Sequence, residues 1–338
     1  MILIMNKMLY VLVLMVIALA SCKNEPATPE NKVVLDAWND GAIKTQITKF
    51  LERDTVDIPI KDRIAVFDMD GTIACETPLW FEMYCAVAKM NDNLKSNPSL
   101  IDEMEYKCAE RLYKDPKSKC VREHWSTPEA NYIDSIIWKA FEGVSHEEYV
   151  KYCTNYLTTA VNKDKKMVLG DMFYKPMVQL LHLLLEKHYK VYVVSGSVQG
   201  VIWSIVPQKT PLKERKQLVG TRQILTPKYT ASGTKFIIKK GIFTPKNNNA
   251  GKSENIYSKL GVQPIFAFGN TTGDFDMLQY AITHPRKGVG FMLNHDDKRE
   301  YVYPPYHGKP EPDWKERIDS FGGVVVSMKN DFKKVWIK

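Results

Sequence analysis

The sequence has no internal repeats, no low-complexity segments and no basic block interleaved with aromatic residues. Its lysines are scattered, often in pairs such as Lys165-Lys166, Lys239-Lys240 and Lys333-Lys334, although the formal net charge is +8. A nucleic-acid-binding protein would gather its basic residues on one face or along one helix. We therefore expect no nucleic-acid partner, and we assign the positive balance to a solvated surface with a mildly positive cleft.

Cysteine is scarce, and the 6 cysteines follow no zinc-binding spacing. Apart from Cys22, an odd number of them remains, so they cannot all pair in disulfides. A disulfide between Cys108 and Cys120 is one alternative, because both lie in the same stretch of the chain. The interpretation that we favour is that the cysteines are small, buried hydrophobic side chains.

The apolar run from Met8 to Ala20 is too short to span a bilayer comfortably. Lys7 precedes it and small residues end it, which is typical of a signal peptide. The ending Leu19-Ala20-Ser21-Cys22 resembles the lipobox of bacterial lipoproteins, in which cleavage precedes a lipidated cysteine. We expect residues 1–22 to be a lipoprotein signal peptide. The mature chain would then be anchored through Cys22 at the periplasmic or outer-membrane face of a bacterium. An ordinary secretory signal is the alternative.

Polar residues and two prolines follow this segment and predict a tether. From Val34 to Leu51 apolar residues recur at helical spacing, which predicts an amphipathic helix. We assign residues 23–60 to this tether and N-terminal helix. The apolar run Ile64-Ala65-Val66-Phe67 then predicts a strand that is buried on both faces.

A long helical stretch follows this strand. Helices are expected after Pro78, after Ser99, from Thr127 and from Ser145, which has the spacing of a capping box with Glu148. No strand pattern interrupts residues 78–167.

Strands and helices then alternate, which indicates a doubly wound α/β fold with a mostly parallel sheet. The expected strands are 191–194, 218–225, 235–243, 264–268 and 288–293, with the second and third paired around Ser232-Gly233. The expected helices begin near Tyr174, Val198, Gly251 and Phe275.

Two acidic residues directly follow the predicted strand at 64–67. Asp68 and Asp70 are two residues apart in extended chain, so their side chains lean the same way. In an open parallel sheet, ligands bind beyond the carboxyl ends of the strands. Two carboxylates this close repel each other unless a proton or a cation lies between them, and oxygen ligands suit magnesium. The alternative is a plain turn, for which the composition of this segment is also suitable.

Polar residues also follow later predicted strands. The strand at 191–194 leads into Ser195-Gly196-Ser197, and a hydroxyl group before a helix N-terminus suits phosphate oxygens. Lys252 opens a helix after an asparagine-rich loop, and Gly269-Asn270 with Asp274 follows another strand. Taken singly, these residues fit an N-cap, a surface lysine and a loop. Their order at successive strand ends favours one shared site.

The order of these motifs resembles that of the haloacid dehalogenase superfamily of phosphohydrolases. The first family motif, Asp-x-Asp-x-Thr, is matched by Asp68, Asp70 and Thr72. The second, a strand ending in Ser or Thr, is matched by Ser195, and the third, an isolated Lys, is matched by Lys252.

The fourth motif, often written Gly-Asp-x-x-x-Asp, reads here as Gly269-Asn270 and then Asp274, so that Asn replaces the first Asp. The resemblance covers about residues 61 to 300. It implies a Rossmann-like α/β core formed by residues 61–78 and 168–338. It also implies an α-helical cap, residues 79–167, inserted after the first core strand as in the phosphoserine phosphatase-like branch.

The resemblance implies an aspartyl-phosphate mechanism with three catalytic residues. Asp68 would attack phosphorus, and Asp70 would protonate the leaving oxygen and then activate water. Lys252 would help to hold the transferring phosphoryl group. The implied substrate-binding residues are Ser195, Gly196, Thr72 and Glu76, of which Glu76 is expected to bind an amine on the substrate.

The same resemblance implies Mg²⁺ as a cofactor. Its implied ligands are the carboxylate of Asp68, the main-chain carbonyl of Asp70 and the side chain of Asn270. Asp274 would be a further ligand, or would orient Lys252 or a metal-bound water. Because Asn270 is neutral where the family pattern has Asp, we expect weaker magnesium binding rather than lost activity.

The sequence therefore predicts a phosphatase for a small phosphorylated molecule, of the phosphoserine phosphatase type, and no protein partner is inferred. Phosphocholine or another scavenged phosphomonoester is the alternative substrate. Two other functions remain open: a non-catalytic substrate-binding lipoprotein, and a phosphotransferase or mutase acting on sugar phosphates.

Overall fold

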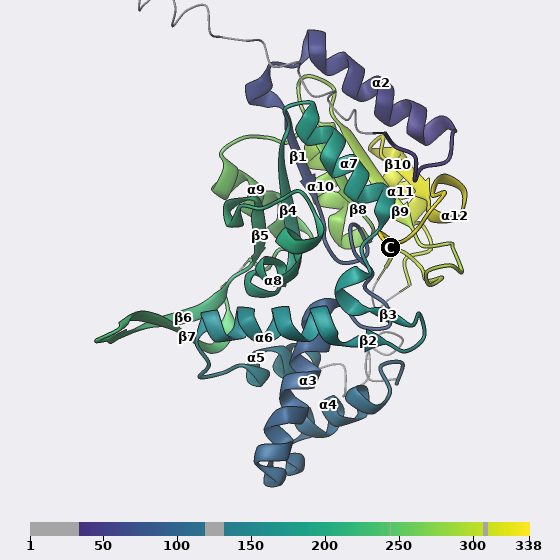
Figure 1. Ribbon diagram of the computed structural model, residues 1–338. Coiled ribbons are helices and arrows are strands. Elements are labelled where there is room, and N and C mark those ends of the chain that lie inside the picture. Colours follow the sequence, from purple (N-terminus) through teal and green to yellow (C-terminus); the bar gives the residue numbers. More distant parts are fainter. Residues whose placement is uncertain (1–33, 119–131, 244, 307–309) are drawn as a thin grey trace, which may run out of the picture. The chain divides into compact units, whose positions relative to one another are not determined.

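A computed structural model describes residues 34–118, 132–243, 245–306 and 310–338 (Figure 1). The predicted signal peptide, Cys22, the tether and Cys120 lie outside these residues. Cys75, Cys85, Cys108 and Cys153 are buried, as predicted. Within the described ranges, no helix is both long and apolar enough to cross a membrane.

A six-stranded sheet forms the centre of the fold, and each pair of neighbouring strands in it is parallel. In spatial order its strands are β10 (Val324–Ser327), β9 (Val289–Asn294), β8 (Phe266–Gly269), β1 (Ile64–Phe67), β4 (Lys190–Val198) and β5 (Leu218–Thr221). The predicted doubly wound α/β fold is confirmed. The strand that precedes Asp68 lies in the interior of the sheet, between β8 and β4.

Helices cover both faces of this sheet because alternate strand residues point to opposite sides. Phe67 belongs to one hydrophobic core, together with residues of α2 (Ala42–Asp57) and α7 (Lys175–Glu186). Val66 belongs to the other core, with residues of α9 (Ala250–Leu260), α10 (Phe275–Ile282) and α11 (Trp314–Ser320). All four residues of β1 are buried, as expected of a strand that is packed on both faces.

Among the described residues between β1 and α7 lie the helices α3 (Phe81–Ser96), α4 (Met104–Lys114), α5 (Tyr132–Ala140) and α6 (His146–Thr159). The predicted capping box is present at α6, where Ser145 and Glu148 each bond the main chain of the other. The predicted helix start at Thr127 lies outside the described residues. The boundaries of the proposed cap, 79–167, stay a prediction.

The expectation that residues 78–167 hold no strand is wrong. A short antiparallel ribbon joins β2 (Val161–Asn162) to β3 (Met167–Val168). Its turn is stabilised by Asn162, whose side chain accepts a hydrogen bond from the main chain of Lys165 at 3.0 Å. Strands of two residues are too short to show an alternating pattern in the sequence.

The N-terminal helix begins at Ala42 and not at Val34, and its N-cap is Gly41. Trp38, which lies before it, forms an isolated bridge with Phe332 and donates its indole N–H to the carbonyl of Pro176 at 2.9 Å. The apolar residues before α2 therefore pack on other parts of the fold and do not continue the helix.

The predicted strand 218–225 is divided at Arg222. Its first part is β5, and its second part is β6 (Gln223–Thr230), which pairs with β7 (Gly233–Ile242) in the expected antiparallel hairpin. Ile238 of β7 also exchanges main-chain hydrogen bonds with Gly143 and Val144, so the hairpin is attached to the loop before α6. The described residues also form the helices α8 (Gln199–Lys209) and α12 (Met328–Asp331). The sequence did not predict α11, α12 or β10.

Candidate active site

The residues predicted to act together lie around one cavity at the carboxyl ends of β1, β4 and β8. This is the edge at which open α/β sheets bind ligands. The strand predicted at 191–194 continues to Val198, with irregular pairing after Val194, so Ser195 and Gly196 lie in the last part of β4 and not after it. The cavity has a volume of about 310 Å³. It is lined by Asp68, Asp70, Glu76, Trp80, Glu82, Ile137, Ser195, Gly196, Ser197, Lys246, Asn248, Lys252, Asn270, Thr271 and Asp274.

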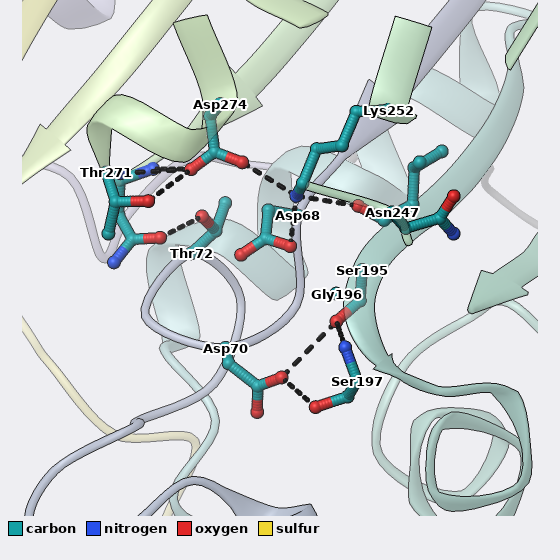
Figure 2. A network of polar contacts seen from close by, with 12 residues as sticks. Asp68, Asp70, Thr72, Ser195, Gly196, Ser197, Asn247, Lys252, Thr271 and Asp274 are labelled. Atoms are coloured by element: carbon teal, nitrogen blue, oxygen red, sulfur yellow. Dashed lines mark hydrogen bonds and ion pairs between the residues drawn. The ribbon is translucent and has the colours of Figure 1, made fainter. Parts of the chain in front are cut away.

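Lys252 connects two of the predicted carboxylates (Figure 2). Its Nζ lies 2.5 Å from Asp68 Oδ1 and 2.7 Å from Asp274 Oδ1, and it donates to the carbonyl of Val194 at 2.9 Å. The side chain of Lys252 is buried, which disfavours its charge, but the carboxylates of Asp274 and Asp68 outweigh burial and raise its pKa. Burial also raises the pKa of Asp68, and Lys252 opposes that rise. The ammonium group therefore helps to keep Asp68 ionised.

The loop before α9 places Lys252 in the first turn of that helix. Asn249 has a φ of 49° at the N-cap, and a side chain at Gly251 would lie 2.0 Å from the carbonyl oxygen of Lys246. Asn247 fastens the loop to β5, because its side chain donates to the carbonyl of Val219 at 3.2 Å. The asparagines of this loop therefore have two roles: Asn249 adopts the positive φ at the N-cap, and Asn247 anchors the loop to β5.

Asp70 lies in a different environment from Asp68. Its Oδ2 accepts hydrogen bonds from the hydroxyl groups of Ser197, at 2.7 Å, and Ser195, at 3.3 Å (Figure 2). Its Oδ1 is buried and has no hydrogen-bond partner among the described residues. Burial raises the pKa of Asp70 to about 6, the bond from Ser197 opposes the rise, and Glu76 adds to it. The group can therefore both donate and accept a proton near neutral pH.

Asn270 is held against the loop that follows Asp68. Thr72 donates from its hydroxyl to Asn270 Oδ1 at 3.1 Å, and Asn270 Nδ2 donates to Glu76 Oε1 at 3.0 Å. Gly71, with a φ of +74°, leaves room for this contact, since a Cβ there would lie 2.0 Å from Asn270 Nδ2. Thr72 is fully buried and does not line the cavity, so it supports Asn270 where substrate contact was expected.

Both carboxylate oxygens of Asp274 are engaged. Oδ1 faces Lys252, and Oδ2 accepts hydrogen bonds from the main-chain N–H groups of Asn270 and Thr271, each at 2.9 Å. This geometry suits a residue that orients Lys252 and the loop after β8. A direct metal contact by Asp274 would require one of these bonds to be given up.

The donor chemistry of the cavity fits a hard divalent cation. Its lining contains five carboxylates against two lysines, so acidic groups are in excess and the expectation of a mildly positive cleft is wrong. The described residues contain no group of three His, Cys, Asp or Glu side chains that could hold a metal. Main-chain and amide oxygens would have to complete the shell, and these also suit magnesium. The oxygens of Asp68, Asp70 and Asn270 provide such a mixed set.

Glu82 is a cavity residue that the sequence reasoning missed. It lies in the first turn of α3, and its Oε1 accepts a hydrogen bond from the main-chain N–H of Val198 at 3.0 Å. The indole N–H of Trp80 lies 3.4 Å from Oε2. Burial raises the pKa of Glu82 to about 7, and Lys246 opposes the rise. A single acidic residue within the apolar run from Trp80 to Met83 was the available signal.

Comparison with known proteins identifies one family. A family model described as haloacid dehalogenase-like hydrolase matches residues 65–279. This match covers more than half of the chain and contains each of the motifs described above. No curated protein matches the sequence.

Solved structures with a similar arrangement are distant in sequence. A conserved functionally unknown protein from Anaerococcus prevotii DSM 20548 is 16% identical, with a TM-score of 0.49 over 76% of this chain and 86% of its own. A phosphoserine phosphohydrolase-like protein from Francisella tularensis subsp. tularensis SCHU S4 is 12% identical, with a TM-score of 0.39 over 78% and 94%. Cytosolic 5'-nucleotidase IIIB bound to cytidine is 13% identical, with a TM-score of 0.44 over 85% and 86%. Similarity at this level carries no argument about activity.

Proposed function

Because the chain belongs to the haloacid dehalogenase-like hydrolase family, we propose that it is a phosphatase for small phosphomonoesters, with Asp68 as the nucleophile. The observation that carries this proposal is the difference between two neighbouring carboxylates. Asp68 is paired with an ammonium group at 2.5 Å, whereas Asp70 is held by hydroxyl groups and has a pKa raised to about 6. Environments that differ in this way suit one carboxylate for attack and the other for proton transfer.

In the first step, a carboxylate oxygen of Asp68 forms a bond to phosphorus as the bond from phosphorus to the leaving oxygen breaks. Asp70 gives its proton to that oxygen, so an alcohol departs and an aspartyl-phosphate remains. In the second step, Asp70 takes a proton from the attacking water. The bond between phosphorus and Asp68 then breaks, which releases inorganic phosphate and restores both carboxyl groups.

The other residues of the cavity hold the transferring group. At the cavity wall, Lys252 presents an ammonium group beside Asp68, and Ser195 presents a hydroxyl group beside Asp70. Such fixed donors are the main resource for phosphoryl transfer, in which positioning and charge dominate. Magnesium, held by Asp68, the main-chain carbonyl of Asp70 and Asn270, would neutralise the nucleophile and polarise the phosphoryl oxygens.

Two further carboxylates of the cavity lining support a substrate that carries an amine. Glu76 and Glu82 both line the cavity, and Trp80 provides an aromatic surface beside them. A cavity of about 310 Å³ suits a small molecule, such as phosphoserine or phosphocholine. Phosphoethanolamine and 2-hydroxyethyl phosphate form a matched pair that differs in the amine. A preference for 2-hydroxyethyl phosphate would contradict this substrate class.

The decisive test uses purified protein without residues 1–22, magnesium and a panel of phosphomonoesters. Asp68→Asn should reduce phosphate release to background, because an amide is a poor nucleophile. Asp319→Asn, at an exposed position of α11, is the matched control and should behave like the wild type. Phosphate release with water as the sole acceptor would separate this function from a phosphotransferase. Undiminished turnover by Asp68→Asn would refute the assignment, and an inactive wild type would favour a binding protein.

A further inference from the structure

Behind the loop formed by residues 68–76, here called the catalytic loop, lies a buried histidine and glutamate pair that the mechanism above does not use. His295 directly follows β9, and Glu300 lies five residues later. His295 Nδ1 and Glu300 Oε2 are 3.1 Å apart, and both side chains are fully buried. The second ring nitrogen, Nε2, lies 2.8 Å from the main-chain oxygen of Gly71.

Hydrogen bonds hold both members of this pair in place. A main-chain oxygen can only accept, so Nε2 of His295 donates to Gly71. Glu300 accepts hydrogen bonds from the hydroxyl of Tyr174 at 2.9 Å, the thiol of Cys75 at 2.9 Å and the main-chain N–H of Tyr301 at 2.8 Å. Together with the contact between His295 Nδ1 and Glu300 Oε2, these bonds fix the position of both side chains.

The pair of His295 and Glu300 is attached to the catalytic loop at two points. His295 binds the carbonyl of Gly71, and Glu300 binds the thiol of Cys75. The N–H of Gly71 donates to the carbonyl of Ala74 at 2.6 Å, so both peptide groups of Gly71 are held. In a trans peptide the N–H and C=O groups point in opposite directions. The main-chain carbonyl before Gly71, that of Asp70, is thereby directed away from Ala74.

We propose that the hydrogen-bonded pair of His295 and Glu300 positions the catalytic loop, a role that rests on the proposed phosphatase function. His295 touches no reacting atom and is a positioning residue. It holds Gly71 at its φ of +74°, and with it the direction of the Asp70 carbonyl and the place of the Asp70 carboxylate. A displacement of about 1 Å at a catalytic group can lower the rate by about 10²-fold.

Two substitutions of His295 separate its two hydrogen bonds. In His295→Gln, the amide nitrogen can occupy the place of Nε2 and still donate to Gly71. In His295→Asn, the shorter side chain places its nitrogen near Nδ1, so it can reach Glu300 but not Gly71. Both variants replace the imidazole ring by a carboxamide, so a merely structural role would affect them alike. His182→Asn, at an exposed position of α7, is the control for a histidine replacement.

We expect His295→Asn to lower kcat by about tenfold or more, with KM changed less than about twofold, and His295→Gln to stay within about threefold of the wild type. Hydrogen–deuterium exchange of residues 68–76, measured without metal, should be faster in His295→Asn than in His295→Gln. Equal kcat values and equal exchange rates in the two variants would overturn the proposal.

A measurement on the wild type does not depend on either variant folding. Nitrogen NMR of the His295 ring, assigned through its stacking on Tyr303 at 4.2 Å, should show a proton on Nε2, as the bond to the Gly71 carbonyl requires. An Nε2 without a proton would overturn the proposal. If the wild type hydrolyses no phosphomonoester, the phosphatase function fails, while the exchange rates and the ring protonation still decide the role of His295.

Discussion

Replacing Glu82 by Gln should make the protein more stable at alkaline pH. Glu82 is 5% exposed, and burial raises its pKa from 4.5 to about 7. Below its unfolded pKa, Glu82 is protonated in both the folded and the unfolded protein, and the fold keeps its full stability. As pH rises through the folded pKa, the buried group must ionise, and the folded state loses this stability. At about 1.4 kcal/mol for each pKa unit, ionisation of Glu82 costs the folded wild type about 3 kcal/mol above pH 7. Gln cannot ionise, and its side-chain oxygen can still accept the hydrogen bond from Val198.

The assay is the unfolding temperature of wild type and Glu82→Gln, without metal or substrate, between about pH 5 and about pH 8. The variant should gain about 2.5 kcal/mol relative to the wild type across this range, or roughly 5 °C. Any constant effect of the amide cancels in this comparison. Glu142→Gln, at an exposed loop position, is the matched control and should track the wild type. A difference between wild type and Glu82→Gln that does not change with pH would refute the reasoning.

Three further predictions concern the cavity. Asp70→Asn should lower kcat by about 10²- to 10⁴-fold for an alkyl phosphate and much less for p-nitrophenyl phosphate. In the wild type, kcat/KM for the alkyl ester should fall above about pH 6, where Asp70 loses its proton. Lys252→Met should lower turnover by about 10²- to 10³-fold and the unfolding free energy in urea by about 3–5 kcal/mol, because two buried carboxylates lose their partner. Asn270→Asp should lower the magnesium concentration needed for half-maximal activity. The new carboxylate would face Glu76, so magnesium should raise the melting temperature of this variant more than that of the wild type.

The central sheet except β10, and three of the strand ends at the site, were predictable because the signals are local. A short apolar run followed by polar residues indicates a buried strand whose end reaches the site, and this holds for Asp68, Ser195 and Asn270. Lys252 could be added from its place at the start of a helix. The register of the sheet then brings these residues to one edge, with β1 between β4 and β8.

Residues whose roles depend on contacts across long stretches of chain could not be predicted in this way. Glu82 meets Val198 at a separation of 116 residues, and His295 meets Gly71 at a separation of 224. Nothing in their local sequence specifies these partners. The start of α2 was misjudged for a related reason, since Trp38 is apolar to pack against Phe332 and not to continue a helix.

The most direct test of the account is a search for phosphate on Asp68 during turnover. Wild-type protein that is hydrolysing a phosphomonoester would be quenched in acid, digested and examined by mass spectrometry. The peptide that contains Asp68 should carry one phosphoryl group, lost on treatment with hydroxylamine and absent from Asp68→Asn. Phosphate found on a different residue of the active wild type would contradict the assignment of Asp68 as the nucleophile.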